Sequence, residues 1–297
     1  MITLPDPVLE PIVRTALAED LGMAGDVTGA LAGAAPLAAV VRARASGVLA
    51  GLAPAGMACR LLDPALRFTP LLPEGAALEP GAVAARLEGP AHSVLAVERT
   101  VLNFLTHLSG VATLTRRFVD AVAHTQARIA ATRKTLPGLR ALQKAAVIAG
   151  GGLPHRYSLG DAVLIKDNHI AAAGSVSEAL RRAQALAGHM RVLEVEVDTL
   201  TQLEEALPFR PHAVLLDNFS LADLAAAVRL AHFQPNPTKS GSDFVDDALS
   251  RARTILEASG GVSLETAAAI AETGVAVISV GALTHSAPAL DLGLDAS

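Results

Sequence analysis

The chain has 297 residues, of which 51% are hydrophobic and 3% aromatic, and its formal net charge is −5. This length suffices for one large α/β domain or for a barrel with a smaller companion, and the mildly acidic balance does not supply the basic face that general nucleic-acid binding requires. Cys59 is the single cysteine, which excludes an intrachain disulfide and a cysteine-based metal cluster. With no apolar run long enough to span a membrane and no secretion signal in residues 1–11, we expect a cytoplasmic protein.

The first part of the chain predicts a small mixed α/β unit. Apolar residues at helical spacing indicate a helix over residues 7–21. Alternating residues within 40–52 indicate a strand that leads into a Gly-rich turn. Eight Gly and Pro residues between 64 and 90 leave room only for short strands. A helix capped by Ser93, followed by a second helix over about 113–124, would join this unit to the rest of the chain.

From residue 127 onward, short β-rich runs alternate with Ala/Leu-rich helical segments, several of which start with Ser or Thr. Strand, cap and helix in repetition are typical of parallel βα units. Six strands are fewer than the eight of a closed barrel, so we predict an open, incomplete (β/α) barrel, with a doubly wound sheet as the alternative. Polar residues 232–253 are predicted to be a surface insertion with one short helix. The six runs are ARIAAT (127–132), DAVLIKD (161–167), VLEVEVD (192–198), HAVLLDN (212–218), TILEASG (254–260) and VAVISVG (275–281).

Cationic residues gather around the first two of these strands. Residues 132–169 contain six Lys and Arg against two Asp, although the whole chain is acidic. The carboxyl ends of parallel strands form the site in such folds, and an arginine fork matches carboxylates and phosphates. Arg140 and Lys144, on the following helix, are predicted to be ordinary surface cations. The predicted anion-binding residues are Thr132, Arg133, Lys134, His155, Arg156 and Lys166.

Carboxylates follow on the next two strands. Period-two alternation places Glu194, Glu196 and Asp198 on one face of the strand over 192–198. Three carboxylates on an otherwise buried strand would be costly unless cations or a metal ion partnered them. We predict that Asp198 caps a helix or forms an ion pair, whereas Glu196 and Asp217 bind a metal or substrate. Two carboxylates supply few oxygen ligands, which suits Mg²⁺ because this ion keeps much of its water.

The last two strands end in small residues, EASGG and SVGAL. Loops after the final strands of (β/α) barrels commonly bind phosphate, because small residues let backbone N–H groups approach it. The pocket therefore suits a polycarboxylate together with a phosphorylated sugar that carries a further phosphate or pyrophosphate group. The predicted phosphate-binding residues are Ser259, Gly260, Gly261, Ser279, Val280 and Gly281.

The chain resembles the quinolinate phosphoribosyltransferases, or carboxylating nicotinate-nucleotide pyrophosphorylases, in TRKTLPGLRALQK, GGGLPHR, LGDAVLIKDNHI, EVEVDTL, LLDNF, EASGG and VGALTHS. GDVT and AVERTVLNFLTHLSG extend the resemblance into the N-terminal part. The resemblance implies an N-terminal α/β sandwich over 1–112, completed by about 285–297, and an open (β/α) barrel of type II phosphoribosyltransferases over 113–284. It also implies a homodimer or higher homo-oligomer with shared sites, in which Arg99 reaches into the partner's site.

The resemblance further implies transfer of phosphoribosyl from 5-phosphoribosyl 1-diphosphate to quinolinate. The products would be nicotinate mononucleotide, CO₂ and pyrophosphate, in NAD biosynthesis. The quinolinate carboxylates would be held by Arg99, Arg133, His155, Arg156 and Lys166. The ribose, the pyrophosphate and its Mg²⁺ would be held by Lys134, Glu196 and Asp217, and the 5-phosphate by the two small-residue turns.

Three departures from the family pattern leave alternatives open. They are Ala131, Pro154 and the AAVI segment at 145–148, and Pro154 also occurs in the molybdenum-associated ModD paralogue. A ModD-like phosphoribosyltransferase with another acceptor is therefore the first alternative. A Schiff-base aldolase that uses Lys166 and a non-catalytic phosphosugar-binding protein are the others.

Overall fold

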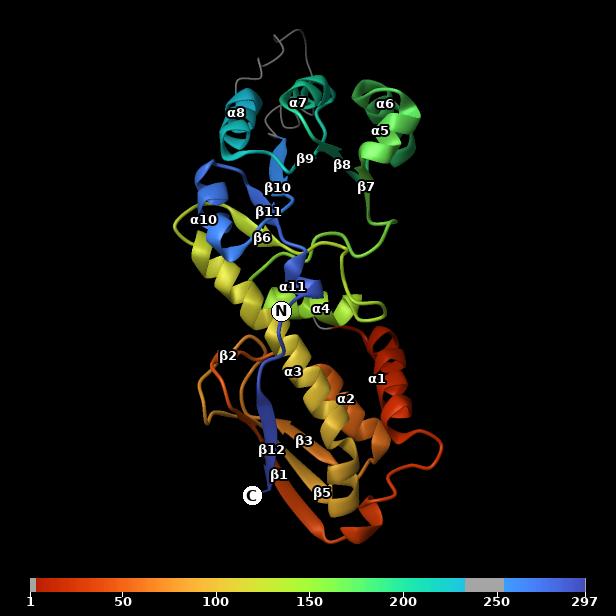
Figure 1. Ribbon diagram of the computed structural model, residues 1–297. Helices are drawn as coiled ribbons and strands as arrows, with labels where there is room; N and C mark the ends of the chain where they lie inside the picture. Colours follow the sequence, from red (N-terminus) through yellow and green to blue (C-terminus); the bar gives the residue numbers. More distant parts are fainter. Residues whose placement is uncertain (1–3, 233–253, 297) are drawn as a thin grey trace, which may run out of the picture. The chain divides into compact units, whose positions relative to one another are not determined.

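The computed structural model describes residues 4–232 and 254–296 (Figure 1). The chain divides into two compact units. Unit 1 comprises Met1–Val119, Lys134–Pro154 and Gly281–Ser297, and unit 2 comprises Asp120–Arg133 and His155–Val280. The domain boundary placed near residue 112 stays a prediction. The predicted insertion lies outside the described residues, apart from His232 at its start.

Unit 1 contains an antiparallel sheet in the order β12-β1-β5-β3. The helix predicted over 7–21 is confirmed as α1. The strand expected within 40–52 begins earlier, at Pro36, and the residues after Ala43 form a turn and the two-residue β2. The elements are α1 (Asp6–Leu21), η1 (Gly29–Leu31), β1 (Pro36–Ala43), β2 (Gly47–Val48), α2 (Leu52–Leu62), β3 (Arg67–Pro70), β4 (Ala77–Leu78), β5 (Val83–Pro90) and β12 (Leu292–Ala296).

A single helix of 32 residues, α3 (Ala91–Val122), replaces the two helices that the sequence predicted. Ser93 is not its cap: the residue lies within the first turn, and its hydroxyl donates to Asp63 Oδ2 over 2.5 Å. Gly110 does not interrupt the helix either. A Cβ on Gly110 would lie 2.0 Å from the Pro288 carbonyl oxygen, so this glycine allows the segment before β12 to pack against the helix.

The segment of unit 1 after Lys134 forms α4 (Arg140–Ala149), which packs against the short α11 (Ala282–His285). Lys144 on α4 is fully buried, and its Nζ donates to the Pro154 carbonyl oxygen. The prediction that Lys144 is a surface cation is therefore wrong. The side of α4 that carries it is the packed side of the helix. Arg140 is half-buried, with its Nε donating to Thr135 Oγ1 over 3.0 Å.

Unit 2 is built on a six-stranded parallel sheet, which confirms all six predicted strands. The order is β6-β11-β10-β9-β8-β7, so each strand from β7 to β11 is added on the same side of the one before. β6 and β7 are the two edges and do not pair, which confirms an open (β/α) barrel rather than a doubly wound sheet with a reversal of order. The strands are β6 (Arg128–Ala130), β7 (Ala162–Ile165), β8 (Val192–Val197), β9 (Ala213–Asp217), β10 (Ile255–Ser259) and β11 (Val277–Ser279).

In unit 2, α6, α7, α8 and α10 begin one residue after the Ser or Thr that the sequence placed at their starts, whereas α5 follows Lys166 and was not predicted. Ser175 Oγ accepts from the backbone N–H of Glu178, and Thr199 Oγ1 accepts from that of Gln202. The α6, α7 and α8 ribbons lie along one side of β7, β8 and β9 in Figure 1. The helices are α5 (Asp167–Ala173), α6 (Val176–Ala187), α7 (Leu200–Ala206), η2 (Leu207–Phe209), α8 (Leu221–His232) and α10 (Leu264–Glu272).

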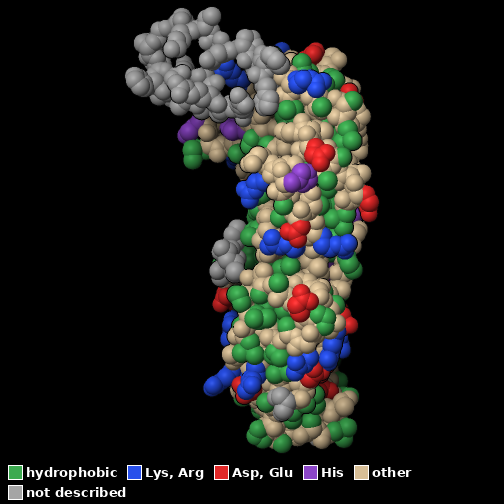
Figure 2. Space-filling model, turned by 90° about the vertical axis from the view of Figure 1, so that its left-hand side faces the viewer, with side chains coloured by type: hydrophobic (Ala, Val, Ile, Leu, Met, Phe, Trp, Pro, Cys, Tyr) green, Lys and Arg blue, Asp and Glu red, His purple; other side chains and the backbone are tan. Residues whose placement is uncertain are grey.

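The surface carries charges of both signs. On the face drawn in Figure 2, Lys and Arg side chains are interspersed with Asp and Glu side chains, in keeping with the formal net charge of −5. Among the described helices, none combines the length and the apolar character needed to cross a membrane.

Candidate functional site

The register of the parallel sheet in unit 2 gathers polar side chains on one face. Glu194 is level with Leu164 of β7 and with Ala213 of β9, and Asp217 is level with Ser259 of β10. Residues that are level across a sheet point to the same side, and the side alternates along each strand. The opposite face takes the buried aliphatic side chains Leu193, Val195, Val197, Val214, Leu216, Leu256, Ala258 and Ile278. The polar face takes Glu194, Glu196, Asp217, Glu257 and Ser259.

The loop before β7 carries Arg156 and is held together by hydrogen bonds to Asp161. The Asp161 carboxylate accepts from the backbone N–H of Tyr157 over 2.7 Å and of Ser158 over 3.1 Å. Arg156 Nη1 donates to the Ala162 carbonyl oxygen at the start of β7 over 3.1 Å. These bonds hold the guanidinium beside the end of the loop, where the sequence predicted an anion-binding residue.

Arg133 and Arg156 lie close enough for their charges to interact. Partial burial lowers the pKa of Arg156, the positive charge of Arg133 lowers it further, and the carboxylates of Glu194 and Asp161 oppose the shift. Arg133 follows β6, and both arginines are half-buried. Two neighbouring guanidinium groups are well suited to one ligand with two negative charges, because such a ligand offsets their mutual repulsion.

Lys166 and Glu196 form an ion pair at the ends of β7 and β8. The Lys166 side chain is 45% exposed and that of Glu196 11%. Asp217 ends β9 on the same face, and its Oδ2 accepts from Asn218 Nδ2 over 2.8 Å. The structure thus places the two carboxylates predicted to hold a metal on neighbouring strands, and it adds a lysine partner to one of them. Two carboxylates that retain access to solvent fit Mg²⁺, which keeps several water ligands.

The turn after β10 requires its glycine. Gly260 has a φ of 88°, and a Cβ there would lie 2.1 Å from Asn218 Oδ1. The Asn218 backbone N–H donates to the Ser259 carbonyl oxygen over 2.9 Å, so the ends of β9 and β10 are joined at this point. Gly261 follows at a φ of 59°. Ser279, the last residue of β11, and Val280 after it are buried, and the Val280 N–H donates to the Ala130 carbonyl oxygen.

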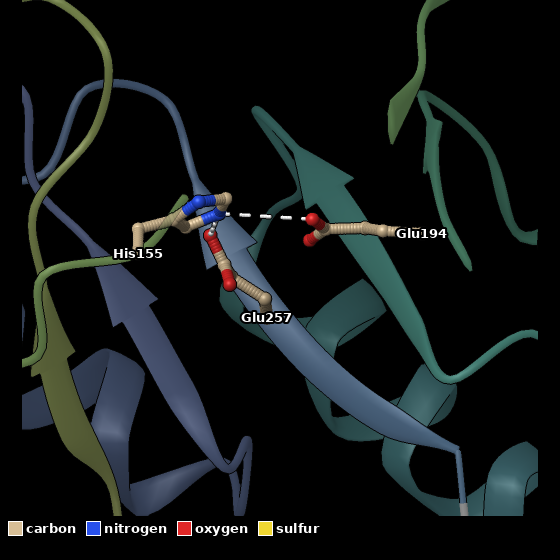
Figure 3. Close-up of side chains that lie close together, drawn as sticks. All are labelled: His155, Glu194 and Glu257. Atoms are coloured by element: carbon tan, nitrogen blue, oxygen red, sulfur yellow. Dashed lines mark ion pairs between the residues drawn. The ribbon is translucent and has the colours of Figure 1, made fainter. Parts of the chain in front are cut away.

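Two glutamates that were not among the predicted site residues surround His155 (Figure 3). His155 Nε2 lies 3.6 Å from Glu194 Oε2 and 3.5 Å from Glu257 Oε1. Burial raises the pKa of Glu194 to about 7, and the charge of Glu257 adds to the shift. The alternation in ILEAS (255–259) places Glu257 on the same face as Ser259, so the same period-two argument that identified Glu196 could have found it.

Three predicted site residues belong to unit 1. Arg99 is exposed on α3. The Lys134 carbonyl oxygen accepts from Thr284 Oγ1 over 2.9 Å, and a Cβ on Gly281 would lie 3.1 Å from Lys134 Cδ. Their roles in binding substrate stay predictions, as do those of Thr132 and the residues of the small-residue turns.

Two family models match nearly all of the chain. The N-terminal domain of quinolinate phosphoribosyl transferase matches residues 26–109, and its C-terminal domain matches residues 111–295. This chain belongs to the quinolinate phosphoribosyltransferase family. Individual relatives agree with the family models. The carboxylating nicotinate-nucleotide pyrophosphorylase of Mycobacterium leprae is 44% identical over 292 residues, which are 95% of each chain.

A second relative of this chain is a probable carboxylating nicotinate-nucleotide pyrophosphorylase of Bacillus subtilis. It is 40% identical over 97% of this chain and 93% of its own length. Among solved structures, the nicotinate-nucleotide pyrophosphorylase from Francisella tularensis has 37% identity and a TM-score of 0.89, covering 99% of this chain and 98% of that chain. The predicted family and fold are therefore confirmed.

Proposed function

We propose that this chain transfers the phosphoribosyl group of 5-phosphoribosyl 1-diphosphate to quinolinate, releasing pyrophosphate and CO₂ and forming nicotinate mononucleotide for NAD biosynthesis. The family is named for this reaction, and the relatives described above carry names for it. Those names favour quinolinate over the acceptor of the ModD paralogue. Within the structure, the neighbouring Arg133 and Arg156 carry the proposal, because quinolinate offers two carboxylates to two guanidinium groups.

The chemistry needs positioning and charge more than a protein nucleophile. The quinolinate ring nitrogen forms a bond to the anomeric carbon of the ribose, and the bond from that carbon to pyrophosphate breaks. The C2 carboxylate then leaves as CO₂, the electron pair of its C–C bond is drawn toward the pyridinium nitrogen, and water supplies the proton that C2 takes up. Arg133 and Arg156 hold the carboxylates so that the ring nitrogen faces the sugar, which is catalysis by orientation.

Glu196 and Asp217 are the residues that would hold Mg²⁺, because both are carboxylates at the ends of neighbouring strands on the polar face. Bound there, the ion would neutralise charge on the departing pyrophosphate. Lys166 contributes a fixed positive charge beside Glu196, and together with His155 it extends the cationic surface for the quinolinate carboxylates. The 45% exposure of the Lys166 side chain argues against an aldolase, whose lysine requires a desolvated pocket.

The remaining parts of the proposal extend to unit 1 and to assembly. Lys134 would bind pyrophosphate, and the turns at 259–261 and 279–281 would bind the 5-phosphate through backbone N–H groups. The protein would act in the cytoplasm as a homodimer or higher homo-oligomer in which Arg99 completes the partner's site. Mixing an Arg99→Ala protein with an Arg133→Ala protein tests the assembly: shared sites predict that the mixture regains activity that neither variant has alone.

The experiment that tests the reaction combines the purified protein with quinolinate, 5-phosphoribosyl 1-diphosphate and Mg²⁺ and measures nicotinate mononucleotide by chromatography. The expected result is product from quinolinate and none when nicotinate replaces it. Turnover of nicotinate or another base alone would move the assignment to a different acceptor, as in the ModD paralogue. Binding of 5-phosphoribosyl 1-diphosphate without turnover of any pyridine carboxylate would support the binding-protein alternative instead.

A further inference from the structure

A buried hydrogen-bond network in unit 1 contains two residues to which the proposed reaction gives no role, Gln143 on α4 and Thr284 on α11. Both lie in segments that carry the family resemblance, TRKTLPGLRALQK and VGALTHS. Gln143 is fully buried, and Thr284 is 1% exposed. A buried amide or hydroxyl is costly unless partners satisfy its donors and acceptors. The partners of these two side chains therefore show what the network holds in place.

The Gln143 amide has a partner for its oxygen and for its nitrogen. Its Oε1 accepts from the Leu136 backbone N–H over 2.9 Å. Its Nε2 donates to the Thr284 carbonyl oxygen over 2.7 Å and to Nε2 of His107, on α3, over 3.0 Å. The orientation of the amide follows from these partners, because a backbone N–H can only donate and a carbonyl can only accept. One side chain thus joins α3, the loop after Lys134 and α11.

His107 takes part in this network as a neutral acceptor. Its Nε2 accepts the amide N–H of Gln143, so the proton of the neutral ring is on Nδ1. Burial lowers the pKa of His107, which favours the neutral ring at pH 7. The network therefore relies on the hydrogen-bonding groups of a neutral amide, and an apolar side chain of similar length at position 143 would remove all three bonds.

Thr284 extends the network to Lys134. Its Oγ1 donates to the Lys134 carbonyl oxygen over 2.9 Å, and its backbone N–H donates to the Gly281 carbonyl oxygen over 3.1 Å. A Cβ on Gly281 would lie 3.1 Å from Lys134 Cδ, so the aliphatic part of the lysine runs close to the backbone of this glycine. Lys134 is proposed to bind pyrophosphate, and Gly281 belongs to a turn proposed to bind the 5-phosphate. The network thus holds backbone at two positions proposed to bind the same substrate.

We infer that Gln143 and Thr284 are positioning residues for 5-phosphoribosyl 1-diphosphate, which fix the backbone of Lys134 and of the loop that follows it. This inference rests on the proposed function for the identity of the ligand. Both side chains are buried, so they act through the backbone that they hold. Without these anchors the loop would spend part of its time in conformations that misplace Lys134. The apparent affinity then falls with the fraction of molecules that remain competent to bind.

A kinetic comparison of Thr284→Val and Thr284→Ser tests the inference. Valine keeps the shape of threonine without the donor to the Lys134 carbonyl, whereas serine keeps the donor. We expect Thr284→Val to raise KM for 5-phosphoribosyl 1-diphosphate roughly tenfold and KM for quinolinate by less than about threefold, because most proposed quinolinate ligands lie elsewhere in the chain. Thr284→Ser should stay close to wild type. Equal increases in both KM values, or a Ser variant as impaired as the Val variant, would overturn the inference.

The matched control is Thr115→Val. Thr115 is fully buried as well, and its hydroxyl donates to the Val111 carbonyl oxygen within α3 over 2.8 Å. This variant should lose some stability in urea titrations while both KM values stay at those of wild type. A rise in KM for 5-phosphoribosyl 1-diphosphate as large as that of Thr284→Val would show a general effect of losing a buried hydroxyl and would overturn the inference.

Hydrogen exchange in the ligand-free protein separates this inference from the proposed reaction. The Leu136 amide should exchange roughly tenfold faster in Gln143→Met, which keeps the unbranched shape of glutamine without its amide, and at the wild-type rate in Thr115→Val. This result would stand even if quinolinate were not turned over, in which case only the proposed reaction fails. Unchanged exchange at Leu136 in Gln143→Met would overturn the anchor with the reaction intact. The Thr284 comparison stands by itself if Gln143→Met does not fold.

Discussion

Replacing Arg156 with Ala should weaken the binding of quinolinate far more than that of 5-phosphoribosyl 1-diphosphate. Truncating one partner of a buried charge pair costs roughly 2–5 kcal/mol. Arg156 is only half-buried, and its loss also relieves the repulsion from Arg133, so the lower part of that range applies. We expect about 2–3 kcal/mol, which corresponds to roughly a 30- to 150-fold increase in KM for quinolinate.

The double variant Arg133→Ala/Arg156→Ala shows whether the two arginines bind one ligand. If both hold the same dianion, the combined loss should be smaller than the sum of the single losses, with a coupling of roughly 0.5–3 kcal/mol. Steady-state assays of nicotinate mononucleotide formation, with each substrate varied in turn, measure all four proteins. Arg229→Ala, at an exposed position on α8, is the control for a general change of charge. Additive losses, or an unchanged KM for quinolinate in Arg156→Ala, would refute the dicarboxylate site.

The remaining predictions concern glycines and the cysteine. Gly260→Ala should raise KM for 5-phosphoribosyl 1-diphosphate at least tenfold, because the new Cβ would collide with Asn218 and φ is positive; normal kinetics would show that this turn does not bind the 5-phosphate. Gly110→Ala should lower the free energy of unfolding by roughly 1–3 kcal/mol or more in urea titrations, since its Cβ would meet the Pro288 carbonyl, and an unchanged midpoint would contradict this packing. Burial raises the pKa of Cys59 to about 12, so iodoacetamide at pH 8 should label it only after unfolding, and rapid labelling of the native protein would contradict the burial.

The parallel sheet of unit 2 could be predicted from the sequence because each signal was local. Alternating residues marked the strands, and a Ser or Thr one residue before α6, α7, α8 and α10 marked the start of each of these helices. The long α3 could not be predicted this way. Gly110 reads as a break when only its neighbours in sequence are considered, whereas the structure uses it for close packing with Pro288, a residue far away along the chain. The prediction that Lys144 is a surface cation was wrong for the same reason, since only the tertiary structure shows that its side of α4 is covered.

The residues of the candidate site likewise differ in whether local sequence alone could identify them. Arg133, Arg156 and Glu196 could be chosen from the sequence because each lies at a strand end or in a loop beside glycines. Glu257 lies in the middle of β10, away from the strand end, and the sequence analysis did not select it. Its partner His155 is about a hundred residues away, so only the fold brings the two together.

The pairing of β12 with β1 has a consequence for the order in which the protein is made. Residues 292–296 complete a sheet whose other strands all lie before residue 91. During synthesis, β1 therefore exposes an open edge while the whole of unit 2 is translated. Unit 2 can form its own sheet in that interval, since none of its strands waits for the last residues of the chain. Unit 2 can therefore form its sheet before β12 has been translated, and the sheet of unit 1 is completed last.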